Sequence, residues 1–298
     1  MTSSPVSHTR MAGLGPMAAI EARRLARHPV FLVGVVLAFV VLGLIYFLDD
    51  RAVLGDGMSI PVIPAFFIGL TSLVAMARLT RSTEAAVEAV ATAPGTEARR
   101  TTALVVACLV PFAAGAAFIA VLLVMATVRG VAPQEWWFGT MPDWQVWSIL
   151  VALGPVACMG GGLLGVLTGR WVRFPGAAAV ILVAVVLISR VGSEPLAHGD
   201  LSELRLWVPW AMFHSGTMTD GTQVLFAGNP AFYLGYVLCL CAAAALVAIW
   251  HDRTARTAQL RTAIVAVIVV GLACLALAMT TGNEDNLTSD PIPSQISE

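Results

Sequence analysis

The sequence of 298 residues contains no lysine, and all 17 of its basic residues are arginine. A GC-rich genome accounts for that bias, but the absence has a chemical consequence. A phosphate-binding loop of the G-x-x-x-x-G-K-[ST] type needs its lysine to reach the β- and γ-phosphates of a nucleotide. This chain therefore cannot contain such a loop, and energy from ATP would have to come from another chain.

Charged residues are also scarce, at 12% of the chain, whereas 58% is hydrophobic and the mean hydropathy is +0.84. In a typical soluble domain about a quarter of the residues are charged. The apolar residues are concentrated in long blocks and do not alternate with polar ones. We therefore predict an all-α fold, a polytopic bundle of membrane helices.

Most of the apolar blocks have about 17 to 26 residues, the length needed to cross a hydrocarbon core of roughly 30 Å. They predict six spans plus a seventh, and the seventh block either crosses the membrane or lies along it. The blocks are Val30–Leu48, Ile60–Ala77, Ala103–Val128, Val146–Thr168, Phe174–Ser189, Ala231–Trp250 and Ala263–Met279.

No block carries Asp, Glu, Arg or His in its interior. Ion-coupled carriers need titratable groups within the membrane, and intramembrane proteases need a catalytic carboxylate pair, a nucleophile with a base, or a zinc motif. The five cysteines all lie inside apolar blocks, and the five histidines are scattered. We therefore predict no enzymatic activity, no metal site and no nucleic-acid partner.

The N-terminal region predicts a tail followed by a surface helix. Residues 1–13 are small and polar, which predicts disorder and no removable signal peptide. On a helix over Leu14–His28, Arg23, Arg24 and Arg27 gather opposite an apolar side. Such a helix suits the membrane interface, with its arginines at the lipid headgroups. The alternative is a basic flank that only orients the first span.

Arginine placement predicts the orientation. With the N-terminus in the cytoplasm, only four arginines face outward: Arg51, Arg129, Arg190 and Arg205. This arrangement satisfies the positive-inside rule, and seven crossings place the C-terminus outside the cell. The third outer loop contains Leu204–His214, which is apolar but too short to cross and predicts a re-entrant or surface helix. Residues 281–298 are polar and acidic and predict a disordered tail.

The segment from Arg78 to Arg100 is a charged loop between two apolar blocks. Glu84 and Glu88 stand four residues apart and share one face of a predicted helix. Pro94 stops that helix, and Thr96 can cap the next one. A short acidic helix between two spans suggests a docking element, and the alternative is a merely solvated loop.

The fourth span is rich in glycine, including Gly161, Gly165 and Gly169 at spacings of four. Small residues at this spacing let two helix backbones approach closely in a membrane. The pattern predicts a tight helix contact, with a flexible gate as the alternative.

The order of these parts resembles the permease subunits of ABC-type exporters of the type-2 permease group, and is most like actinobacterial members. The motif E-x-R-R-x-x-R-x-P of their surface helix is matched by Glu21–Pro29. Their ATPase-contacting loop carries a Glu before a Pro, here Glu88 and Pro94, and Arg99 and Arg100 follow. A long outer loop before the sixth span is also similar. The resemblance covers residues 14–255, and the block within 256–280 is additional to it.

The resemblance implies a membrane-spanning exporter subunit in the bacterial plasma membrane. A separate cytosolic ATPase would bind ATP and Mg²⁺, and a second permease copy would complete a homodimer or related heterodimer among membrane lipids. The ATPase contact would lie at Glu84, Glu88, Pro94, Glu97, Arg99 and Arg100. The alternative is a non-transporting membrane module, such as an anchor or an assembly or signalling partner.

Overall fold

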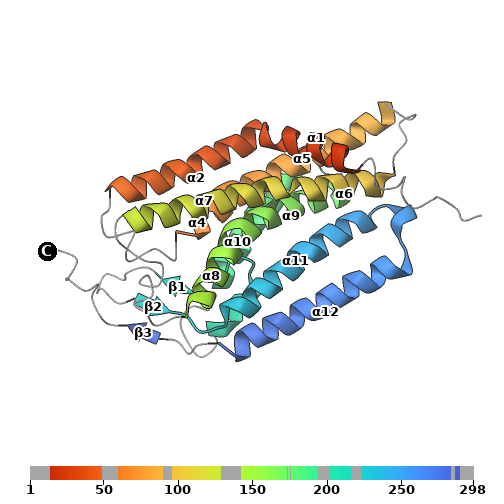
Figure 1. Ribbon diagram of the computed structural model, residues 1–298. Helices are drawn as coiled ribbons and strands as arrows, with labels where there is room; N and C mark the ends of the chain where they lie inside the picture. The colour runs from red at the N-terminus through yellow and green to blue at the C-terminus, as the bar shows by residue number, and fades with distance from the viewer. Residues whose placement is uncertain are drawn as a thin grey trace, which may run out of the picture.

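The computed structural model describes residues 14–48, 60–89, 96–128, 142–172, 174, 176–193, 202–215, 223–282 and 286–288. Most of these residues are helical, and the long helices run along a common direction in one bundle (Figure 1). Helix α1 (Leu14–Ala26) lies at one end of the bundle, and three short strands lie at the other. The predicted all-α class is confirmed.

Six apolar helical segments in the described part of the chain are long enough to cross a membrane. They confirm the prediction of a polytopic membrane protein. The fifth predicted span corresponds to a shorter helix, α10 (Ala177–Ser193), whose apolar part ends at Ser189. The six long segments are Pro29–Phe47, Val62–Ser82, Glu97–Val128, Asp143–Trp171, Pro230–Trp250 and Ala258–Thr280.

Three of these segments consist of shorter helices in series. Prolines accompany the breaks: Pro64 precedes one π-helical turn, Pro155 lies inside another, and Pro111 is in the first turn of α7. Proline has no N–H and crowds the preceding turn, so the regular ladder of hydrogen bonds is interrupted there. The parts are α4 (Val62–Pro64), η1 (Ala65–Gly69), α5 (Leu70–Ala89), α6 (Glu97–Ala107), α7 (Leu109–Val128), α8 (Asp143–Val151), η3 (Ala152–Val156) and α9 (Ala157–Trp171).

Two helices form a hairpin at one edge of the bundle, α11 (Pro230–Trp250) and α12 (Ala258–Thr280), and η5 (Arg253–Ala255) lies in their connection. Helix α2 (Pro29–Leu48) lies at the opposite edge (Figure 1). Only 11% of the apolar window of α12 is buried, against 78% for the fourth span. Helix α12 runs alongside α11 (Figure 1), and its low burial leaves most of its surface for lipid.

The packing of α9 on α5 forms the centre of the bundle. A Cβ atom added at Gly161 would overlap the backbone of Gly69 in η1, and one at Gly165 would overlap the backbone of Leu73 in α5. One added at Gly169 would lie 2.6 Å from a side-chain carbon of α5. The two backbones can approach this closely only because these positions have no side chain. The glycines thus lie in a tight helix contact, and a gating role stays a prediction. The facing pairs are Gly161 with Gly69, Gly165 with Leu73, and Gly169 with Thr80.

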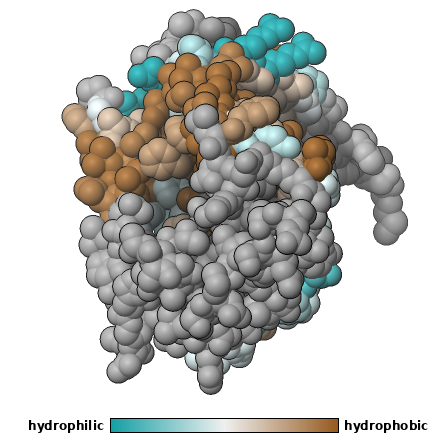
Figure 2. All heavy atoms as spheres, turned by 90° about the vertical axis from the view of Figure 1, so that its left-hand side faces the viewer, coloured by the Kyte–Doolittle hydropathy of each residue, from teal (hydrophilic) through white to brown (hydrophobic). Residues whose placement is uncertain are grey.

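The outer surface of the bundle is apolar where it would meet lipid. Figure 2 looks onto the end that carries the strands, and its upper part is largely brown, on the side where α2 and α7 lie in Figure 1. Exposed side chains near this end include Phe47 at 78%, Val124 at 61% and Val128 at 72%. Such exposure would be unfavourable in water and is expected in a bilayer.

The strands form a small antiparallel sheet in the order β1 (His214–Ser215), β2 (Gln223–Leu225) and β3 (Asn286–Thr288). Within the predicted C-terminal tail, residues 286–288 therefore pair with β2, and residues 283–285 and 289–298 lie outside the described residues. Residues 1–13, the predicted N-terminal tail, lie outside them as well.

The segment predicted as a re-entrant or surface helix at 204–214 is helical only at its start, in the 3₁₀ turn η4 (Ser202–Trp207). Proline at position 209 favours an end to the helix because it cannot donate to the ladder. The buried Arg205, 1% exposed, donates from Nε to the Met212 carbonyl at 3.1 Å and lies 4.6 Å from the ring centroid of Phe226. These contacts join the start of the segment to its end and to Phe226, which directly follows β2.

Candidate functional site

The surface helix α1 packs on α6 and touches the end of α5, at the end of the bundle away from the strands (Figure 1). Its apolar side is buried there, with Ala18 at 7% and Leu25 at 0% exposure. Arg23 and Arg27 are exposed on the other side. The basic helix and the charged loop, which are separate in sequence, thus share one surface.

Arg24 links α1 directly to α5. Its Nη1 lies 3.0 Å from both carboxylate oxygens of Glu21, and its Nη2 donates to the Ser82 hydroxyl at 3.1 Å. An exposed pair such as Arg24–Glu21 adds little stability, typically below about 1 kcal/mol. The contact with Glu21 therefore serves to orient the Arg24 guanidinium toward α5.

Helix α5 continues past the apolar segment and ends at Ala89. Glu84 and Glu88 are therefore four residues apart on its last turns, on one face, as the sequence predicted. The side chains of both, together with all of Pro94, lie outside the described residues. The predicted ATPase contact at these positions stays a prediction.

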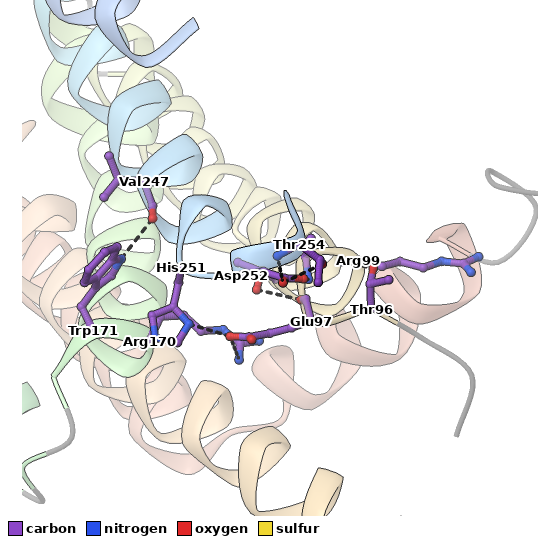
Figure 3. A network of polar contacts seen from close by, with 11 residues as sticks. Thr96, Glu97, Arg99, Arg170, Trp171, Val247, His251, Asp252 and Thr254 are labelled. Atoms are coloured by element: carbon purple, nitrogen blue, oxygen red, sulfur yellow. Dashed lines mark hydrogen bonds and ion pairs between the residues drawn. The ribbon is translucent and has the colours of Figure 1, made fainter. Parts of the chain in front are cut away.

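The next helix, α6, begins where the sequence predicted. The Thr96 hydroxyl accepts a hydrogen bond from the Arg99 backbone N–H at 3.3 Å, which confirms the predicted N-cap. Such a cap satisfies one of the amide groups that have no partner within the helix. The side chain of Arg99 points away from Glu97 and Asp252 (Figure 3). Arg99 and Arg100 are both half-buried.

Glu97 connects the start of α6 to the ends of two other helices. Its Oε1 lies 3.4 Å from Nη1 of Arg170, on α9, and 2.6 Å from Nδ1 of His251, just after α11 (Figure 3). The Arg170 side chain is only 2% exposed, whereas Glu97 is 39% exposed. We refer to Glu97, Arg170, His251 and Asp252 as the polar clasp. The Glu97 carboxylate assigned to an ATPase contact is thus used within the chain.

Asp252 completes the polar clasp from the loop after α11. Its Oδ2 accepts from the Ala98 backbone N–H at 2.8 Å, and its Oδ1 accepts from the backbone N–H and the hydroxyl of Thr254 at 2.8 and 2.7 Å. Burial by itself raises the pKa of this carboxyl, but the hydrogen bonds from Thr254 and Ala98 outweigh it, and the pKa is lowered. An ionised carboxylate is favoured at the N-terminus of α6 by the helix dipole as well.

Trp171 adds an aromatic contact beside the clasp. Its indole N–H donates to the Val247 carbonyl of α11 at 3.0 Å, and its ring meets the His251 ring edge-on at 5.4 Å (Figure 3). Sequence reasoning did not find the clasp. Glu97 and His251 are 154 residues apart, and the only local signal was Asp252 two residues before Thr254 at a helix end.

The polar clasp is an arrangement of contacts between helix ends. Three helix ends are joined by charge-assisted contacts, and the basic helix α1 lies next to them. The described residues contain no group of three His, Cys, Asp or Glu that could hold a metal ion. The polar clasp therefore fixes the start of α6 to the ends of α9 and α11.

Comparison of the chain with known protein families, with curated proteins and with solved structures finds no match. The structure by itself shows that the chain is a polytopic helical membrane protein.

Proposed function

We propose that the chain is the membrane-spanning subunit of an ATP-driven ABC-type exporter, which forms the substrate path and couples to a separate ATPase subunit. The observation that carries this proposal is the packing of α1 against α5 and α6. The family resemblance assigns the ATPase contact to the loop between α5 and α6, and the basic surface helix α1, far from that loop in sequence, lies beside it at one end of the bundle (Figure 1).

The charges at this end support a cytosolic partner. Arg23 and Arg27 are exposed on α1, and Glu84 and Glu88 lie on the last turns of α5. Arg170 and the loop between α11 and α12, with its own arginines, are at the same end, which makes it the cytoplasmic one under the positive-inside rule. Complementary charges on two protein surfaces speed their encounter and fix the orientation in which they bind.

The polar clasp supplies a route for coupling. Because Glu97 and the first turn of α6 bind Arg170, His251 and Asp252, a displacement of α6 would carry the ends of α9 and α11 with it. Helix α9 is in turn locked to α5 by the glycine contacts. A displacement of α1 and α6 by the ATPase would therefore also displace α9 and α5 at the centre of the bundle.

The nucleotide site and the second half of the substrate path would lie on other chains. The absence of lysine excludes a P-loop here, so ATP and Mg²⁺ would bind the ATPase subunit. A second copy of this chain, or a related subunit, would complete the substrate path in the plasma membrane. The exposed apolar surfaces of α2 and α12 are available for that copy and for lipid.

We expect ATP hydrolysis to copurify with the full-length protein from its native cells in a gentle detergent. In this proposal Glu88 faces a basic groove of the ATPase, which an arginine would repel. Glu88→Arg is therefore expected to lower the copurified hydrolysis at least tenfold, while the protein still inserts. Asp143→Arg, at the start of α8 and the other end of the bundle, is the matched control and should change little.

An eluate without ATP hydrolysis would count against the exporter and favour a non-transporting anchor or assembly partner. Equal losses with Glu88→Arg and Asp143→Arg would show that the docking surface is not at α5. In both cases, insertion is checked by the yield of protein in the membrane fraction.

A further inference from the structure

An elongated apolar cavity of about 380 Å³ lies inside the bundle between α5, α9, α10 and α11. Along α9 its lining extends from Ala157 to Leu167, and along α11 from Val237 to Val247. Pro209 and Trp210, from the segment after η4, also line it. We refer to this cavity as the slot. It is separate from the polar clasp and from the α1 surface.

The dimensions of the slot fit one leaflet of a bilayer. Ten residues of helix separate the first and last lining positions on both α9 and α11, which corresponds to about 15 Å at 1.5 Å per residue. The hydrocarbon core of a bilayer is about 30 Å thick. The slot therefore runs along the helices over about half of that thickness, in the part of α11 nearer to its C-terminal end.

The chemistry of the slot excludes water and polar ligands. Its lining consists of Leu, Val, Ala, Gly and Pro with one Trp and one Cys, and it contains no charged residue, carboxamide or hydroxyl group. A buried water needs two to four polar partners, and these residues do not offer them. An empty slot would lose dispersion contacts on all of its walls. An apolar occupant is therefore expected.

One end of the slot is closed by the segment that follows η4. The Tyr233 hydroxyl donates to the Val208 carbonyl at 2.9 Å and accepts from the Ala211 N–H at 2.8 Å, and the Tyr236 hydroxyl donates to the Trp207 carbonyl at 2.7 Å. Both tyrosines lie on α11, one to two turns inside its start. The segment is thus fixed to the first two turns of α11, and its residues Pro209 and Trp210 line the slot.

The side of the slot between α10 and α11 opens toward lipid. In the described residues these two helices are in little or no contact with each other. Helix α10 packs on α5, α9 and η4, whereas α11 packs mainly on α12 and α9. Val185 of α10 and Leu240 of α11 line the slot, and Leu240 is 38% exposed. A chain-like molecule in the bilayer could enter sideways through this gap.

We propose that the slot binds one acyl chain of a membrane lipid, which enters between α10 and α11 from the leaflet nearer to α1. The length of about half a bilayer favours a chain over a compact molecule. The wholly apolar lining favours hydrocarbon over any headgroup. The proposal stands on the slot itself and does not rest on the exporter function.

The test uses the full-length protein in nanodiscs containing phosphatidylglycerol with a diazirine in the middle of one acyl chain, without nucleotide or partner subunit. After illumination, adducts are mapped by peptide mass spectrometry. We expect adducts at lining positions of α9 and α11, such as Leu164 and Ala244, at least fivefold above those on the lipid-facing side of α12. Uniform labelling of all exposed apolar surfaces would overturn the proposal.

Variants that fill the slot provide the second arm. Ala244→Phe and Val185→Trp enter it from opposite walls, and each is expected to lower labelling of Leu164 at least fivefold. Ala266→Phe, at an exposed position of α12, is the matched control and should leave that labelling unchanged. Each variant is checked for a single size-exclusion peak. If a variant fails to fold, the adduct map of the wild-type protein still decides the proposal, because that map needs no variant.

A third arm distinguishes another apolar occupant. A small aromatic diazirine is added to nanodiscs that contain unmodified lipid. If this compound labels the slot and the lipid probe does not, the acyl-chain proposal is wrong and the slot takes compact apolar molecules. Since no nucleotide or ATPase is present, none of these outcomes affects the test of the exporter function.

Discussion

Replacement of Gly165 by leucine is expected to prevent the protein from folding, or to lower its stability by about 3 kcal/mol or more. A Cβ at this position would overlap the carbonyl of Leu73 on α5, and the atoms that it meets belong to the backbone. A flexible side chain could move aside, whereas two packed helices can yield only by separating. Overpacking in a core typically costs roughly 1–3 kcal/mol, and this contact is at the centre of the bundle.

The measurement is thermal unfolding in detergent, followed by the loss of a monodisperse size-exclusion peak. Gly43→Leu on α2 is the matched control, since a Cβ added there meets nothing within 4 Å. It should leave the unfolding temperature nearly unchanged. Equal behaviour of the two variants would contradict the close packing of α5 and α9. If Gly165→Leu folded normally and lost only transport, the gate would be the better interpretation of this position.

The second large effect is expected at the polar clasp. Glu97→Ala removes the carboxylate that lies 3.4 Å from Arg170 and 2.6 Å from His251, and the Arg170 side chain is almost fully buried. Loss of a charged acceptor from a buried group typically costs about 1–3 kcal/mol. Because Glu97 itself is 39% exposed, solvent screening places the expected loss in the lower half of that range.

Two comparisons make the Glu97 result specific. Glu21→Ala removes the pair with Arg24, whose side chain is 41% exposed, and should lower stability by less than about 1 kcal/mol. Glu97→Gln keeps an acceptor oxygen and should recover part of the loss. Unfolding is followed for each purified variant at neutral pH. Identical stabilities of Glu97→Ala and Glu21→Ala would show that the clasp does not hold α6 to α9 and α11.

The membrane fold could be predicted because it depends on local properties. The length and hydropathy of each block set the spans, and the Thr96 cap depends on residues within one turn. The breaks within the spans also have local causes, since a proline lies near each of them. Hydropathy alone does not show these breaks, because a broken helix and a straight one have the same composition.

The polar clasp and the slot could not be predicted in this way. Both depend on which helices are neighbours, and the amphipathic signal that would reveal this is weak when all sides of a helix are apolar. The family resemblance assigned Glu97 to an external partner. Its contacts with Arg170 and His251 could not be predicted because they join parts of the chain that are distant in sequence. The glycines of α9 were the exception, since their spacing predicted a close contact, although not the identity of α5 as the partner.

The docking of an ATPase on the α1–α6 surface is tested most directly by site-specific photo-crosslinking in native membranes. A photoreactive residue is placed at Arg23, exposed on α1, and in a second protein at Asp143, at the other end of the bundle. We predict an adduct from position 23 that contains a subunit with a nucleotide-binding loop, and no such adduct from position 143. No such adduct from position 23, or the same adduct from both positions, would contradict the proposed function.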